Sequence, residues 1–164
     1  MVFLRAAFQN VDLAIAPSKF LMQMFSRNGY ETKRILYSPH GLDTSWMTQT
    51  CTRDSGSTLC IGYVGQIDPI KGVDVLVRAF QLIPAQMPVE LRVYGDLSKN
   101  PRFTEALLQI SAGSPKIKFM GPFERSELGR VLSLIDVVAV PSVWYENTPL
   151  AIAEAFAAGK PVIA

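Results

Sequence analysis

Apolar and polar residues alternate along this chain with two different periods, and the order of the periods predicts its elements. After residue 58, short apolar or alternating runs typical of strands are separated by longer segments whose apolar positions have a helical spacing. The expected strands are 59–65, 89–95, 116–121, 136–142 and 160–164, and the expected helices are 71–83, 102–112, 124–134 and 148–158. This order favours right-handed crossovers on a parallel sheet, which means an α/β, Rossmann-like, doubly wound fold.

The residues before this region follow a shorter pattern that ends in a linker. They read as a strand (11–18), a helix (19–28, before Gly29) and a second strand (33–41). The stretch 48–58 is polar and aperiodic, which is typical of a linker. We therefore expect residues 1–47 to be the tail of a preceding domain. We expect 59–164 to be the main domain, incomplete at its C-terminus because it ends on a buried-type strand with no covering helix.

The composition narrows the possible classes of protein. A chain of 164 residues, of which 49% are hydrophobic, can bury a sizeable core. Its net charge of +2 gives no argument for nucleic acid as a partner, and no apolar run reaches the length of a membrane span. Cys51 and Cys60 are too few and too far apart for a zinc site. We therefore expect no metal and a reduced, cytoplasmic protein.

The loop after the strand 59–65 carries the first candidate binding residues. Ligands of open parallel sheets bind beyond the carboxyl ends of the strands. Gly65 permits close approach of a ligand to the backbone, and Lys71 stands at the expected start of the next helix. Free N–H groups of a helix start and an ammonium group together suit a diphosphate. The alternative is an ordinary turn with a solvated lysine.

The loop before the helix 148–158 has a strong helix-start signal. Thr148 is a hydroxyl residue suited to cap the helix, and Pro149 suits its first position. The free N–H groups behind them predict a second anion site. Glu146, just before them, would repel an adjacent phosphate, so it suits sugar hydroxyls or a cationic group better.

Glu154 is the one charged residue in an otherwise apolar helix. Burial of an ionised carboxylate without partners costs several kcal/mol, roughly. Glu154 is therefore exposed, paired with Arg or Lys in a salt bridge, or available to hydroxyl donors. The alanines beside it on a helical projection, Ala151, Ala157 and Ala158, leave room for a ligand.

Four stretches together resemble a known family. They are "GYVGQIDPIKGVDVLVRAF", "LRVYGD", "KIKFMG" and "DVVAVPSVWYENTPLAIAEAFAAGKPVIA". They resemble the nucleotide-binding domain of GT-B-fold retaining glycosyltransferases of family 4, and Glu146-x7-Glu154 is similar to the paired glutamates (EX7E) of that family. By the same resemblance, residues 1–47 would be the end of the acceptor-side domain.

The resemblance implies a role for each candidate residue. Glu154 would bind the ribose of a nucleotide-sugar donor, and Glu146, as a catalytic residue, the donor sugar. Lys71 would neutralise the diphosphate as the second catalytic residue. The remaining donor-binding positions would be Gly65, Gln66, Asn147, Thr148, Pro149 and Leu150. Gln66 departs from the arginine usual in the family, which removes one cation from the diphosphate site.

The implied reaction is transfer of a sugar from a nucleoside diphosphate to a glycan or lipid acceptor with retention of configuration. No cofactor or metal is implied. The acceptor would bind the missing N-terminal domain, so this part alone is expected to be inactive. The resemblance places the full enzyme in the cytoplasm or peripheral to the inner face of the membrane. Two alternatives remain open, a GT-B-fold sugar-nucleotide epimerase and a non-catalytic nucleotide-binding module.

Overall fold

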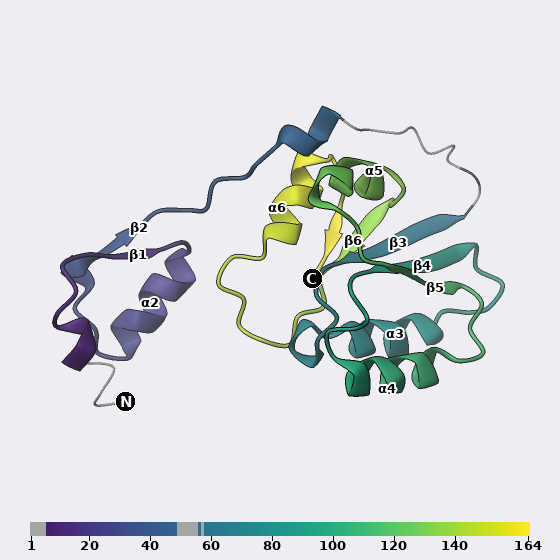
Figure 1. The fold of residues 1–164 in the computed structure, drawn as a ribbon, viewed down its shortest axis with the longest axis horizontal. Helices are drawn as coiled ribbons and strands as arrows, with labels where there is room; N and C mark the ends of the chain where they lie inside the picture. The colour runs from purple at the N-terminus through teal and green to yellow at the C-terminus, as the bar shows by residue number, and fades with distance from the viewer. Residues whose placement is uncertain (1–5, 49–55, 57) are drawn as a thin grey trace. The chain divides into compact units, whose positions relative to one another are not determined.

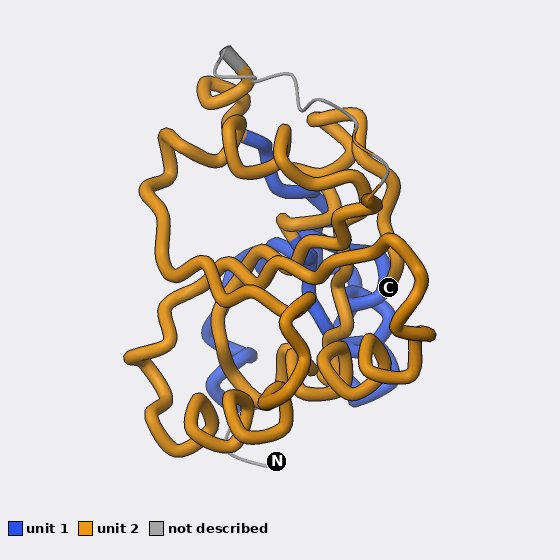
Figure 2. Tube along the Cα trace, turned by 90° about the vertical axis from the view of Figure 1, so that its right-hand side faces the viewer, with its two compact units in different colours: residues 1–42, 146–149 blue, residues 43–145, 150–164 orange. Residues whose placement is uncertain are grey.

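A computed structural model describes residues 6–48, 56 and 58–164, which form two compact units (Figure 2). The first unit is Met1–Leu42 with Glu146–Pro149, and the second is Asp43–Tyr145 with Leu150–Ala164. The first unit thus ends five residues before the expected boundary at residue 47, because Trp46 is 3% exposed and packs in the core of the second unit. Residues 49–55 and 57 of the expected linker lie outside the described residues.

The first unit is the predicted strand–helix–strand motif. Its elements are β1 (Ala14–Ala16), α2 (Lys19–Arg27), the short 3₁₀ helix η1 (Thr32–Arg34) and β2 (Ile35–Tyr37), with β1 and β2 parallel. The Ser18 hydroxyl caps α2 by accepting a hydrogen bond of 3.1 Å from the Leu21 N–H. Gly29 follows the helix with a φ of 76°, which is the left-handed conformation that glycine adopts readily.

The second unit is built on a five-stranded parallel sheet in the order β5-β4-β3-β6-β7 (Figure 1). Its strands are β3 (Leu59–Val64), β4 (Val89–Tyr94), β5 (Ile117–Gly121), β6 (Val137–Ala139) and β7 (Val162–Ile163). Its helices are α3 (Val73–Gln81), α4 (Pro101–Ser111), α5 (Leu128–Ser133) and α6 (Leu150–Ala157), with the 3₁₀ turns η2 (Ser45–Thr48), η3 (Pro69–Lys71) and η4 (Arg125–Glu127). Helices cover both faces, so the predicted α/β, Rossmann-like, doubly wound fold is confirmed.

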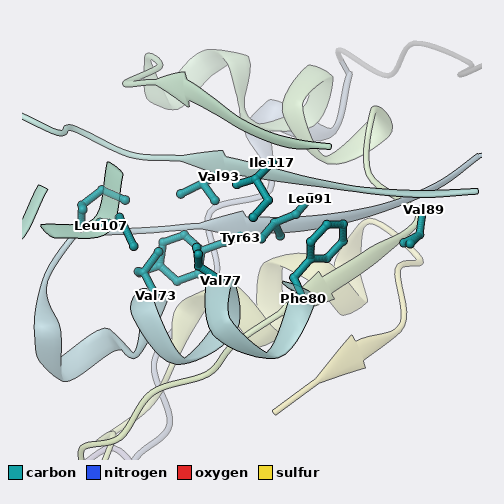
Figure 3. Packing of buried hydrophobic residues seen from close by; sticks show 10 residues of the cluster. Tyr63, Val73, Val77, Phe80, Val89, Leu91, Val93, Leu107 and Ile117 are labelled. Carbon is teal, nitrogen blue, oxygen red and sulfur yellow. The ribbon is translucent and has the colours of Figure 1, made fainter. Parts of the chain in front are cut away.

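The first face of the sheet packs on α3 and α4 (Figure 3). Alternate residues of β4, Leu91 and Val93, point to this side, where Val73 and Val77 of α3 meet them. All four are at most 1% exposed. The period of two in the strand and the helical period in α3 therefore converge on one core, as the sequence pattern predicts.

The opposite face packs on α5, and η2 and α6 contribute to the same core. Trp46 of η2, Tyr94 of β4 and Ala155 of α6 are all buried there. Burial raises the pKa of the Tyr94 hydroxyl, and the nearby Arg92 guanidinium opposes this shift. The second core explains why the residues just before the linker belong to this unit.

An ion-pair network crosses the N-terminal half of β4 and reaches β5. The Glu90 carboxylate accepts hydrogen bonds of 2.7 Å from Arg92 Nε and 2.7 Å from Lys118 Nζ. Its side chain is 12% exposed. Burial acts to raise the pKa of Glu90, but the hydrogen bonds and charges of Lys118 and Arg92 outweigh burial and hold it below its ordinary value.

Replacing Glu90 by glutamine is expected to lower the free energy of unfolding by about 1–2 kcal/mol at pH 7. A folded-state pKa below the unfolded value gives stability that is complete above the ordinary glutamate value of 4.5 and is lost as the pH falls through the folded-state pKa. The variant should therefore differ most from wild type at pH 7 and progressively less below pH 4.5. Urea unfolding at several pH values measures both effects. The exposed Glu105→Gln change is the control, and an equal loss in both variants would contradict the network.

Candidate functional site

A glycine lies at the carboxyl end of each of three neighbouring strands, β3, β4 and β5. The Gly65 N–H donates to the Tyr94 carbonyl (3.1 Å), and the Gly95 N–H donates to the Gly121 carbonyl (3.0 Å). A Cβ on Gly95 would lie 2.3 Å from the Gly65 carbonyl oxygen, so only glycine permits this approach of the two backbones. Gly65 therefore stands at the predicted binding edge. Its own N–H is engaged within the sheet.

The position of Lys71 in the loop after β3 differs from the expected helix start. Lys71 is the last residue of η3 and does not start the following helix, which begins at Val73. Between them Gly72 has a φ of 67°, a left-handed conformation that interrupts the helical run and separates the two helices. Asp68 caps the start of η3, since its carboxylate accepts a hydrogen bond of 3.1 Å from the Ile70 N–H. Lys71 thus lies in the turn immediately before the first N–H groups of α3.

The loop after β6 packs directly against this turn. The Val143 N–H donates to the Ile70 carbonyl at 3.1 Å. A Cβ on Gly72 would lie 2.0 Å from the Pro141 carbonyl oxygen, which leaves no room for any side chain. The Lys71 turn and the loop that leads toward α6 are therefore joined backbone to backbone at the carboxyl edge of the sheet.

Gln66, the residue after Gly65, is exposed at the same edge. Its backbone carbonyl accepts a hydrogen bond of 2.6 Å from the Tyr63 hydroxyl, which fixes the loop to the end of β3. The side chain is neutral, so the ammonium of Lys71 is the cation that this loop itself supplies.

Glu154 is buried in α6 and paired with a cation. The residue is 7% exposed, and its Oε1 accepts a hydrogen bond from Arg125 Nη1. The Arg125 side chain is 53% exposed. Of the three states considered for Glu154, the structure shows a salt bridge. The carboxylate is not exposed, and its partner is half open to solvent.

The structure adds Arg125 and Asp43 to the candidate residues. Arg125 opens η4, which follows β5 and contacts η2. Asp43 precedes η2, and the Ser45 backbone N–H donates to its carboxylate at 2.9 Å. That N–H and the Ser45 hydroxyl lower the pKa of Asp43, and the charge of Arg125 adds to them. The only signal in the sequence is a cation just past a strand, at the binding edge.

The segment Glu146–Pro149 belongs to the first unit, whereas Gly65, Gln66, Lys71, Leu150 and Glu154 belong to the second. The helix α6 begins at Leu150, one residue after the expected first position at Pro149. The Thr148 hydroxyl donates to the carbonyls of Asn147 (2.8 Å) and, more weakly, of Pro17 (3.4 Å). The predicted Thr148 cap is therefore replaced by bonds to backbone carbonyls. The roles of Glu146 and Asn147 stay predictions.

The part of the chain that the structure describes contains no group of His, Cys, Asp or Glu residues arranged to hold a metal ion. No helix within 6–48 or 58–164 is both long and apolar enough to cross a membrane.

The sequence model of one protein family matches most of the chain. The sequence model of the family described as "Glycosyl transferases group 1" matches residues 58–164. Curated relatives include a D-inositol 3-phosphate glycosyltransferase of Mycolicibacterium gilvum, 37% identical over 108 residues (63% of this chain, 24% of the relative). That of Stackebrandtia nassauensis is 36% identical over 115 residues (65% and 26%). The chain thus spans about a quarter of the length of these relatives.

Several solved structures share the fold of this chain. The Anabaena protein Alr3699/HepE in complex with UDP and glucose matches with a TM-score of 0.82 and 24% identity, over 99% of this chain and 47% of that one. Sucrose-phosphate synthase from Thermosynechococcus elongatus matches with a TM-score of 0.81 and 24% identity, over 98% and 42%. At this identity the likeness concerns the fold.

Proposed function

Because this chain belongs to the glycosyl transferases group 1 family, we propose that it forms the donor-binding part of a retaining glycosyltransferase. The donor is a nucleoside diphosphate sugar, and the acceptor is a glycan or lipid. The observation that carries this proposal is the joined pair of loops at the carboxyl edge of the sheet, with Lys71 beside the first turn of α3 and Glu154 on the helix that follows the second loop.

The diphosphate is assigned to the Lys71 turn. Ligands of open parallel sheets bind at this edge. An ammonium group and the N–H groups at the start of α3 together attract an anion. As the bond from the sugar to the diphosphate breaks, negative charge grows on the leaving phosphate oxygen. In this proposal Lys71 stabilises that charge, which is the main catalytic contribution of a preorganised cation.

The ribose and the sugar are assigned to the two glutamates. A carboxylate accepts hydrogen bonds only, which suits the vicinal hydroxyls of ribose at Glu154 and of the donor sugar at Glu146. Asn147, Thr148, Pro149 and Leu150 are assigned to the donor-binding backbone between them. Uridine, guanosine and adenosine diphosphates all carry the same ribose and diphosphate, so these roles hold for any of the three bases.

Titration calorimetry with UDP, GDP and ADP tests the proposal on this chain. At least one nucleotide should bind, and Glu154→Gln should weaken that binding by roughly tenfold, since a charged hydrogen-bond acceptor becomes a neutral amide. Glu105→Gln on the outer surface of α4 removes the same charge elsewhere and should leave the affinity unchanged. If no nucleotide binds at millimolar concentration, or if Glu154→Gln binds as well as wild type, the assignment is wrong.

A further inference from the structure

The salt bridge of Glu154 obstructs the role proposed for it. Among the described residues, Arg125 is the one ion-pair partner of this carboxylate. Glu154 is almost fully buried, whereas the side chain of Arg125 is 53% exposed. The guanidinium that pairs with the buried carboxylate therefore belongs to a side chain that is itself half open to solvent. Ribose hydroxyls arriving from solvent and the Arg125 guanidinium compete for the same oxygens.

A second acceptor for the guanidinium is available nearby. Asp43 is exposed, and its carboxylate is held by the backbone N–H of Ser45. The turn η4, which Arg125 opens, contacts η2, and η2 begins two residues after Asp43. The charge of Arg125 also contributes to lowering the pKa of Asp43. The two carboxylates differ in their need for a partner. Leaving the buried Glu154 carboxylate without a hydrogen bond costs free energy, whereas water solvates the exposed Asp43 carboxylate. Arg125 therefore has a low-cost position to occupy when other donors satisfy Glu154.

We propose that Arg125 is a positioning residue that covers Glu154 in the nucleotide-free protein and turns toward Asp43 when ribose hydroxyls replace it. This inference rests on the proposed function, because it takes Glu154 as the ribose acceptor. The hydroxyls replace the guanidinium hydrogen bond, so the buried carboxylate has donors in both states. The exchange lowers the apparent affinity for nucleotide by the fraction of molecules in which Arg125 covers Glu154.

Replacing Arg125 by alanine should therefore tighten UDP binding, by roughly two- to fivefold, the range that a half-exposed ion pair supplies. Loss of a positive charge near the site acts in the opposite direction on an anionic ligand, so the sign of the effect is diagnostic. Arg130→Ala is the matched control. Arg130 is 50% exposed and pairs with Glu127 at 2.8 Å. This control should leave UDP affinity unchanged or slightly weaken it.

The ligand can be varied to identify the contact. Arg125→Ala should bind UDP more tightly than wild type does. This gain in affinity should disappear with 2′,3′-dideoxy-UDP, which lacks both ribose hydroxyls but keeps the base and the diphosphate. An equal gain with both ligands would overturn the exchange with ribose. Equal or weaker UDP binding by Arg125→Ala would show that the guanidinium supports the site and would also overturn the proposal.

If Arg125→Ala folds poorly, a second variant tests the same movement of Arg125. Asp43→Asn alters an exposed residue and removes the alternative partner of Arg125, so UDP binding should weaken by roughly two- to threefold. Unchanged or tighter binding in this variant would overturn the movement toward Asp43. Failure of the proposed function has a different signature: Glu154→Gln would bind UDP like wild type. If Glu154→Gln weakens binding and Arg125→Ala or Asp43→Asn behaves otherwise than stated, only the present inference fails.

Discussion

Replacing Lys71 by methionine is expected to weaken binding of UDP by roughly 10- to 100-fold, since hydrogen bonds to charged groups are worth about 1.5–3 kcal/mol. The methionine keeps most of the apolar stem and removes the ammonium. The loss should depend on the phosphates of the ligand. It should be largest for UDP, smaller for UMP and absent for uridine, because the number of phosphate groups available to Lys71 falls from two to one to none. Titration calorimetry with the three ligands measures the series.

The control for Lys71→Met is Lys99→Met. Lys99 lies in the loop after β4, its side chain is 79% exposed, and its ammonium is 3.8 Å from Asp96. This change removes the same charge from the same general edge of the sheet, so it measures the long-range electrostatic effect alone. An equal loss of UDP affinity in both variants, or a loss with uridine in Lys71→Met, would show that Lys71 does not contact the diphosphate.

The strands and helices of the second unit were predictable where their buried side chains recur with a regular period. The apolar positions of α3, for example, recur with the helical period, and Val73, Val77 and Phe80 are the residues it buries. The first and last residues of these elements were less predictable. Nothing in the apolar period of 71–83 reveals that Gly72 takes a left-handed conformation, since the close approach of Pro141 that requires glycine comes from the distant loop after β6.

The candidate site was predictable to the extent that it depends on strand ends. Lys71 and Gln66 follow β3 and must lie at its carboxyl edge in any parallel sheet. The state of Glu154 was not predictable, because its partner Arg125 is 29 residues away in sequence and comes from a different crossover. The burial of Trp46 could not be predicted either, because it also depends on residues that are distant in sequence. A tryptophan beside a polar linker gives no periodic signal, and only the completed sheet provides the pocket it fills.

Replacing Gly72 by alanine is expected to lower the free energy of unfolding by about 2–5 kcal/mol. A left-handed conformation costs a residue with a Cβ roughly 1–2 kcal/mol, and crowding in a well-packed region adds about 1–3 kcal/mol. The crowding here is with backbone, since the new Cβ would meet the Pro141 carbonyl oxygen at 2.0 Å. One of the two loops must then move, so UDP affinity should fall as well.

Gly113→Ala separates the two contributions to this loss. Gly113 has a φ of 88°, and no atom lies within 4 Å of the Cβ it would gain. This variant therefore reports the cost of the left-handed conformation alone, and UDP affinity should be unchanged. Urea unfolding should show Gly72→Ala to be less stable than Gly113→Ala by at least about 1 kcal/mol. Equal losses would mean that the loops after β3 and β6 do not meet at Gly72. The backbone contact that fixes the turn of Lys71 against the loop after β6 would then have no support.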